Sequence, residues 1–267
     1  TGSIPTELGQ LSALSVLSLW GNQLEGTIPT EIGNLAALTS LLIAQNSLTG
    51  TLPTHLGNLP AMKTLELFDN SLTGTLPTEL GELIELEELS VNRNNLTGIM
   101  PTELGQMIAL QVLSAFDNML NGTIPTEVGN LAALTTLSLA QNSLTGTLPT
   151  HLGDLIAMKT LELLENSLTG TLPTELGELM ELQICLLFSN EFIGSIPMEM
   201  SDLNNLMDFR FYGNRLTGSV NDIFCTNGRE WDNLESDCLS ADGITEIECA
   251  CCTRCCNANT TICSFIF

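Results

Sequence analysis

The sequence predicts an α/β-type solenoid, a right-handed arc of stacked coils with little helix and a nine-strand parallel sheet on its concave side. The first observation is a 24-residue spacing of asparagines, which divides the chain into coils 1 to 9: Asn22, Asn46, Asn70, Asn94, Asn118, Asn142, Asn166, Asn190 and Asn214. The second is proline at the same spacing from Pro5 to Pro197, and the third is glycine from Gly2 to Gly218. Such a period is typical of repeat architectures, in which each unit buries its apolar side chains only against its neighbours.

The strand and the turn come first in each unit, as coil 2 shows with LAALTSLLIAQNSLTGTLPTHLGN at residues 35–58. Leu41 and Ile43 alternate with Ser40, Leu42 and Ala44, which is the period of a strand with one buried face. Asn46 follows where the strand turns. Its amide can bond the turn backbones of adjacent coils and satisfy polar groups that burial would otherwise leave unpaired, so we expect a ladder of asparagines.

The return segment of each unit is predicted to be extended and then to follow the outer arc. Gly50 fits a position that needs a positive φ or a close backbone approach, and Pro53 fixes φ in the extended segment. Leu56 and Leu59 then point inward from the outer arc. Proline and glycine leave no room for long helices there, so irregular structure or 3₁₀ turns are expected.

Two histidines were copied with a block of repeats. Residues 30–86 and 126–182 agree at 48 of 57 positions, four coils apart, and His55 and His151 are equivalent in the two blocks. They stand in a column that otherwise holds glutamate, on the solvated outer arc. A surface substitution is therefore favoured over a pH-sensitive pair.

Composition excludes several classes of function. The chain has 267 residues and a formal net charge of −24, which disfavours nucleic acid and anionic lipid as partners. No run approaches the ~18 apolar residues of a membrane helix, although a longer parent protein could continue into one. The start at TGSIPTELG falls within a repeat, so we expect an N-terminal cap to be missing, with Leu11, Leu14 and Leu17 near an open edge.

The sequence contains no motif for catalysis or for a cofactor. P-loop, dinucleotide-binding, nucleophile-elbow and HExxH patterns are all missing from the sequence. The acidic pair Glu87–Glu88 cannot serve as two carboxylates facing across a cleft, because neighbouring strand residues point to opposite faces. We therefore expect a protein that is not an enzyme and that has no catalytic residues, cofactor or metal.

A cysteine-rich segment follows the repeats and divides the chain into a solenoid, residues 1–224, and a cap, residues 225–267. We predict disulfides for its eight cysteines: Cys225, Cys238, Cys249, Cys251, Cys252, Cys255, Cys256 and Cys263. The alternative is a zinc or iron–sulfur site. Adjacent cysteines are expected to bond elsewhere, and Cys185, in place of an inward leucine, is expected to be a buried free thiol. Three sequons support a secretory route: Asn95, Asn121 and Asn259.

The motif L-x-x-L-x-L-x-x-N-x-L-x-G-x-[IL]-P-x-x-L-G resembles the plant-type leucine-rich repeat over roughly the first five-sixths of the chain. The resemblance implies a curved solenoid and an extracellular or cell-surface location, as in receptor-like ectodomains or secreted inhibitors. The repeated wording LTGTLPTELG and the tail patterns W-x-x-L-x-x-D-C and C-x-C-C-x-x-C-C are most similar to diatom receptor-like proteins, in which a membrane span often follows the cap.

The candidate ligand site is a column of outward residues two positions before each ladder asparagine, where bulky apolar groups recur about every second coil, ~9–10 Å apart. The column reads Trp20, Ala44, Phe68, Asn92, Phe116, Ala140, Leu164, Phe188 and Tyr212. The following residues include Asp69, Arg93, Asp117 and Glu165, and Glu66 and Glu162 lie one row over. We expect this surface to bind an extended peptide, protein or polysaccharide, with a cationic peptide first.

Two alternatives to a receptor-like ectodomain remain open at this point. Threonine recurs in files, one of which is Thr27, Thr51, Thr75, Thr123, Thr147 and Thr171, and stacked coils would array these side chains regularly, as in ice-binding solenoids. A secreted inhibitor of a wall-degrading enzyme is the other alternative. The plain explanation for the files is that threonine suits extended backbone and that repeats copy it.

Overall fold

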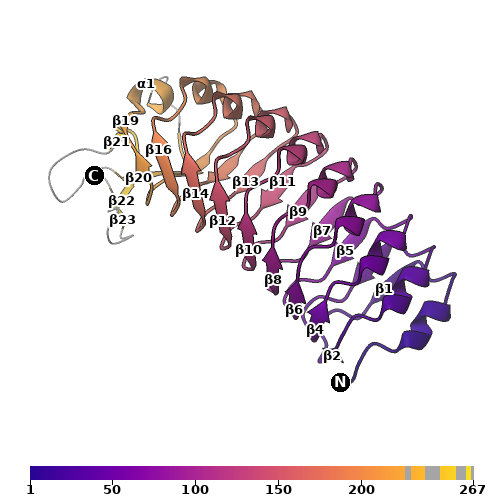
Figure 1. Cartoon of the computed structure of the whole chain (residues 1–267). Coiled ribbons are helices and arrows are strands. Elements are labelled where there is room, and N and C mark those ends of the chain that lie inside the picture. The colour runs from indigo at the N-terminus through magenta and orange to yellow at the C-terminus, as the bar shows by residue number, and fades with distance from the viewer. Residues whose placement is uncertain (226–229, 238–246, 257–262, 266–267) are drawn as a thin grey trace.

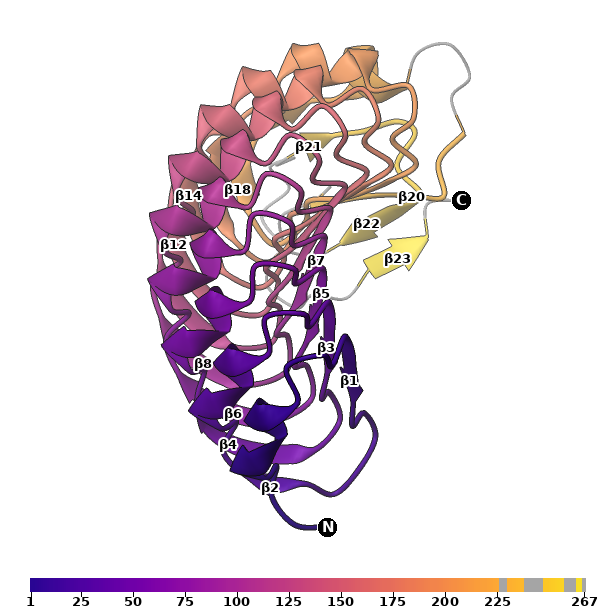
Figure 2. The same cartoon turned by 90° about the vertical axis from the view of Figure 1, so that its right-hand side faces the viewer.

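A computed structural model gives the structure of the chain and describes residues 1–225, 230–237, 247–256 and 263–265. The coils stack into an arc with the first coil at one end and the cap at the other (Figure 1). Each repeat places one short strand on the inner side of the arc and one 3₁₀ helix on the outer side (Figure 2). The predicted leucine-rich coils are therefore present along the chain.

The concave sheet is longer than predicted. Its repeat strands pair in parallel, so that equivalent residues such as Leu41 and Leu65 lie side by side: β1 (Val16–Ser18), β3 (Ser40–Leu42), β5 (Thr64–Glu66), β7 (Glu88–Ser90), β9 (Val112–Ser114), β11 (Thr136–Ser138), β13 (Thr160–Glu162), β15 (Ile184–Leu186) and β17 (Asp208–Arg210). The sheet continues through parallel β20 (Asn233–Asp237) and β22 (Arg254–Cys256) to antiparallel β23 (Cys263–Phe265), giving 12 strands in the described residues. The expected nine strands were too few, because residues beyond the repeats also pair in register.

A second parallel sheet, which the sequence analysis did not predict, runs along the side of the arc. It has nine strands in the described part of the chain: β2 (Glu25–Gly26), β4 (Ser47–Thr51), β6 (Ser71–Gly74), β8 (Asn95–Gly98), β10 (Met119–Gly122), β12 (Ser143–Gly146), β14 (Ser167–Gly170), β16 (Glu191–Gly194) and β18 (Arg215–Leu216). Each strand comprises all or part of the S-L-T-G segment or its equivalent. Extended threonine favours this pairing, which becomes possible once every coil has the same length.

The outer side of the arc carries 3₁₀ helices, as predicted. The described residues contain η1 (Thr6–Gln10), η2 (Thr30–Asn34), η3 (Thr54–Asn58), η4 (Thr78–Glu82), η5 (Thr102–Gln106), η6 (Thr126–Asn130), η7 (Thr150–Asp154), η8 (Thr174–Glu178) and η9 (Met198–Asp202). Pro53 precedes η3 in the extended conformation, with φ −69° and ψ 133°. A side chain at Gly57 would collide with the backbone carbonyl of Glu79 in the next coil, so glycine permits the close stacking.

The asparagine ladder is confirmed and joins the two sheets. The Nδ2 atom of Asn94 donates to the carbonyl oxygens of Val91, Asn92 and, in the preceding coil, Leu67, at 3.1–3.3 Å. Its Oδ1 atom accepts from the backbone N–H of Leu72, also in the preceding coil, at 3.0 Å. The buried amide thus satisfies backbone groups where the chain leaves one sheet and enters the other. Gly50 has the predicted positive φ, 78°.

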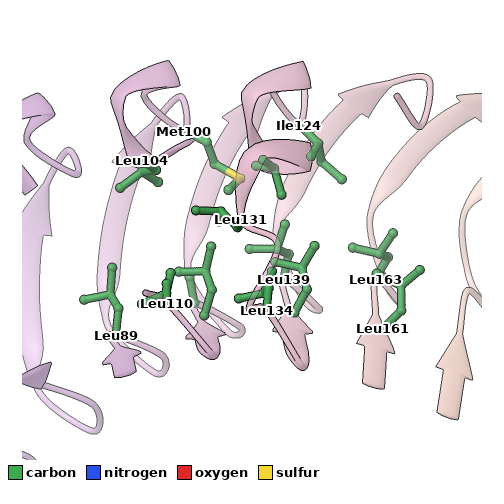
Figure 3. Close-up of a cluster of buried hydrophobic side chains, with 14 of the residues drawn as sticks. Leu89, Met100, Leu104, Leu110, Ile124, Leu131, Leu134, Leu139, Leu161 and Leu163 are labelled. Atoms are coloured by element: carbon green, nitrogen blue, oxygen red, sulfur yellow. The ribbon is translucent and has the colours of Figure 1, made fainter. Parts of the chain in front are cut away.

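The core is a continuous stack of aliphatic side chains between the concave strands and the outer helices. Figure 3 shows Leu89 and Leu161 projecting from concave strands and Leu104 from the outer arc, with Met100 also on that side. All four side chains are buried. Cys185 occupies the inward position next to Leu161 and is a buried free thiol, as predicted, and burial raises its pKa.

The two ends of the stack differ in burial. In the first coil Leu11 is 49% exposed and Leu14 is partly buried, whereas Leu17 is 8% exposed. At the other end an aromatic cluster closes the core, with rings of neighbouring members 4.5–5.5 Å apart: Phe209, Phe211, Phe224 of α1 (Asn221–Phe224) and Trp231. A small pair of strands, β19 (Gly218–Ser219) and β21 (Ile247–Glu248), lies beside it. Among the described residues, no helix has the length and apolar character needed to cross a membrane.

Candidate binding surface

Two neighbouring columns of the concave face contain most of the predicted site. We call the residues two positions before each ladder asparagine the ring column, and those one position before it the turn column. The turn column reads Gly21, Gln45, Asp69, Arg93, Asp117, Gln141, Glu165, Ser189 and Gly213. Both columns follow directly after the concave strands, so they lie along one border of the concave sheet.

The ring column alternates between projecting and covered side chains over its first seven coils. Trp20 is 51% exposed, and Phe68, Phe116 and Leu164 are each half-buried. The intervening Ala44, Asn92 and Ala140 are each at most 7% exposed. Small, covered residues therefore separate the larger apolar side chains, which project from the surface.

The alternation ends at coil 8, where Phe188 adds a bulky group between the groups of coils 7 and 9. Phe188 and Tyr212 lie on successive coils, and their rings stack with centroids 4.6 Å apart and planes 11° from parallel. Stacked rings of this kind form a broad, rigid apolar surface. The C-terminal part of the ring column is thus a double platform, unlike the single rings nearer the N-terminus.

The turn column adopts the left-handed backbone conformation throughout. Its non-glycine members from Gln45 to Ser189 have φ between 52° and 55°. This property was not predicted from the sequence, although glycine at the same position in the first and last coils was a signal for it. These side chains contact one another from coil to coil: Gln45 donates to Asp69 at 3.5 Å, and Gln141 donates to Glu165 at 3.1 Å.

Arg93 is the cation of the turn column, and residues of neighbouring coils hold it on both sides. Its Nη1 atom lies 3.6 Å from Oδ2 of Asp69 in the preceding coil. Its guanidinium carbon lies 5.4 Å from the ring centroid of Phe116 in the following coil. Of the predicted acids, Asp69 is therefore neutralised within the protein, and one face of Phe116 is covered.

The remaining predicted acids have no cationic partner among the described residues. Asp117 is exposed and makes no side-chain hydrogen bond or ion pair there. Glu162 accepts a hydrogen bond from Ser138 at 2.6 Å. Burial raises the pKa of the Glu66 carboxyl, and the Glu88 carboxylate on the next strand raises it further. The concave face therefore carries unneutralised negative charge beside its apolar groups.

Charged residues at the C-terminal end of the concave sheet are largely paired with each other. Arg210 forms a two-pronged contact with Asp208, with nitrogen–oxygen distances of 2.7 and 2.6 Å. Arg254 lies 3.5 Å from the buried Glu235. Burial raises the pKa of the neighbouring Tyr212 hydroxyl, and the Glu235 carboxylate adds to the shift. Of these residues only Tyr212 was expected from the sequence to belong to the site; Glu235 and Arg254 lie beyond the last ladder asparagine, where the repeat pattern has ended.

One threonine file runs along the edge of the second sheet, and two of the predicted sequons lie on that sheet. The file that starts at Thr27 is exposed in every coil where it holds threonine, and Ile99 interrupts it. Asn95 on β8 and Asn121 on β10 are also exposed. Asn259 lies outside the described residues. Glycans on these two asparagines would stand on the second sheet and leave the concave face open.

The cap contains disulfides. Cys225 bonds to Cys251, and Cys249 bonds to Cys252, so neither Cys251 nor Cys252 bonds to its neighbour in sequence, as expected. Cys255 and Cys256 are also disulfide-bonded, whereas Cys238 and the side chain of Cys263 lie outside the described part. The sulfur atoms of Cys225, Cys249 and Cys251 lie within 4.8 Å of one another, but all three take part in disulfides.

Comparison with known proteins supports the repeat and its architecture. A model described as "Leucine-rich repeat region" matches residues 1–117, and one described as "Leucine Rich Repeat" matches residues 133–155. No curated protein matches the chain.

Solved structures of plant receptors are similar to this chain. The plant peptide hormone receptor RGFR1, solved in complex with RGF2, is 38% identical over 88% of this chain and 37% of its own, with a TM-score of 0.82. The ectodomain of the Arabidopsis thaliana receptor kinase GASSHO1/SCHENGEN3, in complex with CASPARIAN STRIP INTEGRITY FACTOR 2, is 34% identical over 98% of this chain and 32% of its own, with a TM-score of 0.85. The chain thus spans about a third of the length of these receptors.

A plant ice-binding protein is also similar to the chain. It is 26% identical over 76% of this chain and 73% of its own, with a TM-score of 0.61. The fold therefore offers two candidate binding surfaces. One is the concave sheet with its ring and turn columns, and the other is the second sheet with the threonine file along it.

Proposed function

We propose that this chain, whose fold is a leucine-rich-repeat solenoid, is a non-catalytic extracellular recognition module that binds an extended ligand along its concave sheet. Receptor ectodomains solved with peptide hormones share its fold and about a third of its residues, which supports a peptide or protein ligand. On the resemblance of its cysteine-rich tail, we further place it with the diatom receptor-like proteins. The disulfides of the cap suit an oxidising compartment.

The observation that carries this proposal is the ring column. Phe68, Phe116 and Leu164 project from the concave face and are only half-buried, although the core of the solenoid does not need them. Apolar groups that remain accessible in a line are typical of interaction surfaces. An extended ligand that crosses the coils would cover each projecting group in turn and fill the spaces over Ala44 and Ala140.

Charge favours a basic peptide over a neutral glycan. Glu66, Asp117 and Glu162 lie beside the ring column without a cationic partner in the described structure. A lysine or arginine of a ligand would neutralise them, so binding should weaken as salt rises. A polysaccharide resting its sugar rings on the aromatic groups is the second choice, and a protein such as a wall-degrading enzyme is a third occupant to test.

Peptide and glycan arrays probed with the disulfide-bonded chain are the first experiment. The strongest ligand should lose roughly tenfold or more in affinity with the combined changes Phe68→Ala, Phe116→Ala and Asp117→Ala. The matched control is Thr51→Ala, Thr75→Ala and Thr147→Ala along the second sheet, which should bind as the unchanged chain does. A ligand whose affinity is unaffected by the concave variant would overturn the proposal.

Ice binding is a second candidate, favoured by the exposed threonine file at the ends of the strands of the nine-strand parallel sheet and by the similarity to a plant ice-binding protein. Strands about 4.8 Å apart would present methyl and hydroxyl groups at regular intervals. Ile99 breaks the file and the sequons at Asn95 and Asn121 would place glycans beside it, which disfavours a flat contact. Inhibition of ice recrystallisation that is lost on changing Thr51, Thr75 and Thr147 to lysine, and kept by the concave variant, would establish this function instead.

A further inference from the structure

We propose that Glu165, Ser189 and Tyr212, on coils 7 to 9, form a site for a cationic group of the ligand, a guanidinium or an ammonium from a basic peptide. The site lies at the C-terminal end of the concave face, and the inference rests on the proposed function of that face. It adds a position and a chemical specificity to it: one cation, held between an acid and an aromatic ring.

The protein contains its own example of such a cation site four coils earlier. Arg93 of coil 4 ion-pairs with Asp69 of coil 3 at 3.6 Å and lies over the ring of Phe116 of coil 5 at 5.4 Å. An acid and a ring on either side of one turn position can therefore hold a guanidinium, through a charge-assisted contact and a cation–π contact. The side chain in the middle comes from the chain itself.

The same arrangement recurs at a displacement of 96 residues with the central residue changed. Glu165 replaces Asp69 and Tyr212 replaces Phe116, so the acid and the ring are retained, while Ser189 replaces Arg93. The equivalence extends to the support of the acid, because Gln141 donates to Glu165 as Gln45 donates to Asp69.

The backbone at the central position is the same in both places. Arg93 has φ 54° and Ser189 has φ 55°. The difference between the two places therefore lies in the side chain, and the short hydroxyl of Ser189 has no charge to offer the acid. A cation at the later place has to come from the ligand.

The surroundings at the later place also favour a cation. Arg210 is engaged by both oxygens of Asp208. Burial raises the pKa of the Tyr212 hydroxyl most, the carboxylates of Glu235, Glu165 and Asp237 raise it further, and the Arg210 guanidinium lowers it. Phe188 stacks on Tyr212 at 4.6 Å, where the earlier place has the amide of Asn92. The two rings cover each other's facing sides, so a guanidinium at this place contacts the ring faces and edges that the stack leaves open.

A pair of small probes tests the chemistry without knowledge of the natural ligand. N-acetyl-Gly-Arg-Gly-amide carries the guanidinium, and the same tripeptide with citrulline is its neutral counterpart of nearly equal shape. In amide NMR spectra of the whole disulfide-bonded chain, the arginine probe should shift the signals of Glu165, Ser189 and Tyr212. The citrulline probe should bind roughly tenfold more weakly or not at all.

Exchanging the central residues between the two places provides the matched variants. Ser189→Arg should supply the cation from within and abolish the shifts, whereas Ser189→Gln should leave them, because glutamine already occupies the same backbone conformation at Gln45 and Gln141. Arg93→Ser should create a second set of shifts at Asp69 and Phe116. General destabilisation would not create probe-induced shifts at one place and abolish them at the other.

Three results would overturn the inference: equal binding of the arginine and citrulline probes, shifts in Ser189→Arg as large as in the unchanged chain, or no shifts with the arginine probe. These outcomes are separable from the failure of the proposed function. An array ligand that loses affinity for the variant with Phe68, Phe116 and Asp117 changed, but keeps its affinity for Ser189→Arg, would support binding on the concave face and contradict the cation site. Binding of the arginine probe alone, with no array ligand on the concave face, would support the cation site and contradict the proposed function.

Discussion

The concave sheet and the second sheet have one strand per coil and share one leucine core, but their exposed columns differ. At the ends of the strands of the second sheet, the file of Thr27 repeats the same residue in six of the seven coils from Thr27 to Thr171. On the concave sheet the turn column changes from glutamine to aspartate, arginine, glutamate and serine along the arc. The backbone tolerates this range, because every member up to Ser189 has the same left-handed conformation. Copying of the repeat therefore leaves one face uniform and the other chemically diverse, and diversity is what selective recognition needs.

The largest expected effect concerns the ladder that joins the two sheets. Asn94→Ala removes a buried amide that bonds to Leu67 and Leu72 in the preceding coil, and leaving these backbone groups unpaired should cost roughly 3–5 kcal/mol of unfolding free energy. The matched control is Asn22→Ala, because exposed Asn22 donates only to Leu19 and Trp20 of its own coil in the described structure. Its expected cost is below about 1 kcal/mol, and equal costs in chemical denaturation would contradict the role given to the ladder.

A somewhat smaller effect should show where the two sheets end. The second sheet stops at β18, whereas the concave sheet runs on through β20 and β22 next to the disulfides of the cap. The Cys225–Cys251 bond links residues 26 apart, so reduction should destabilise the cap by about 3 kcal/mol. Hydrogen exchange should accelerate in β20 and β22 and stay unchanged from β4 to β14. Stoichiometric zinc bound by free thiols in the native protein would contradict the disulfide assignment.

The smallest effect is a pH-dependent one at Glu66 on the concave face. Its pKa is raised in the folded protein by burial and by Glu88, so its charge opposes folding once pH rises through the folded-state pKa. Below the unfolded value of about 4.3 the penalty disappears. Glu66→Gln should therefore raise Tm at pH 7 and leave it unchanged at pH 4, with a gain below about 1 kcal/mol because the side chain is solvated.

The control for this prediction lies four coils later in the same column. The Glu162 carboxylate accepts a 2.6 Å hydrogen bond from Ser138, so Glu162→Gln should give no gain in Tm at either pH. If Glu66→Gln also lowers affinity for a basic ligand, the concave face keeps a charge that costs stability because binding requires it.

The repeat allowed most of the scaffold to be predicted from sequence. The inward leucines, the positive φ of Gly50 and the extended Pro53 each follow from local chemistry and are confirmed. The second sheet was missed because a strand such as Ser71–Gly74 is short and ends in glycine, and its pairing depends on the next coil being in register. The strands of the cap were missed because the leucine pattern ends before β20.

The candidate surface was only partly predictable for a similar reason. Composition and spacing placed Phe68, Phe116 and Phe188 in one column, but partners such as Arg93 over Phe116 come from neighbouring coils. The stacking of Phe188 on Tyr212 likewise depends on the distance between coils and the directions of both rings. Sequence therefore predicts which residues share a column, and the structure adds which of them already satisfy each other.

Carboxyl footprinting tests the central claim most directly, because the unmodified chain has reporters on both faces. Carbodiimide labelling followed by mass spectrometry would compare the free chain with the chain saturated by the strongest array ligand. Binding along the concave face should protect Asp117, Glu162 and Glu165 and leave the labelling of Glu191 on the second sheet and Glu103 on the outer arc unchanged. Protection of Glu191 or Glu103, with Asp117 and Glu165 labelled as in the free chain, would contradict it.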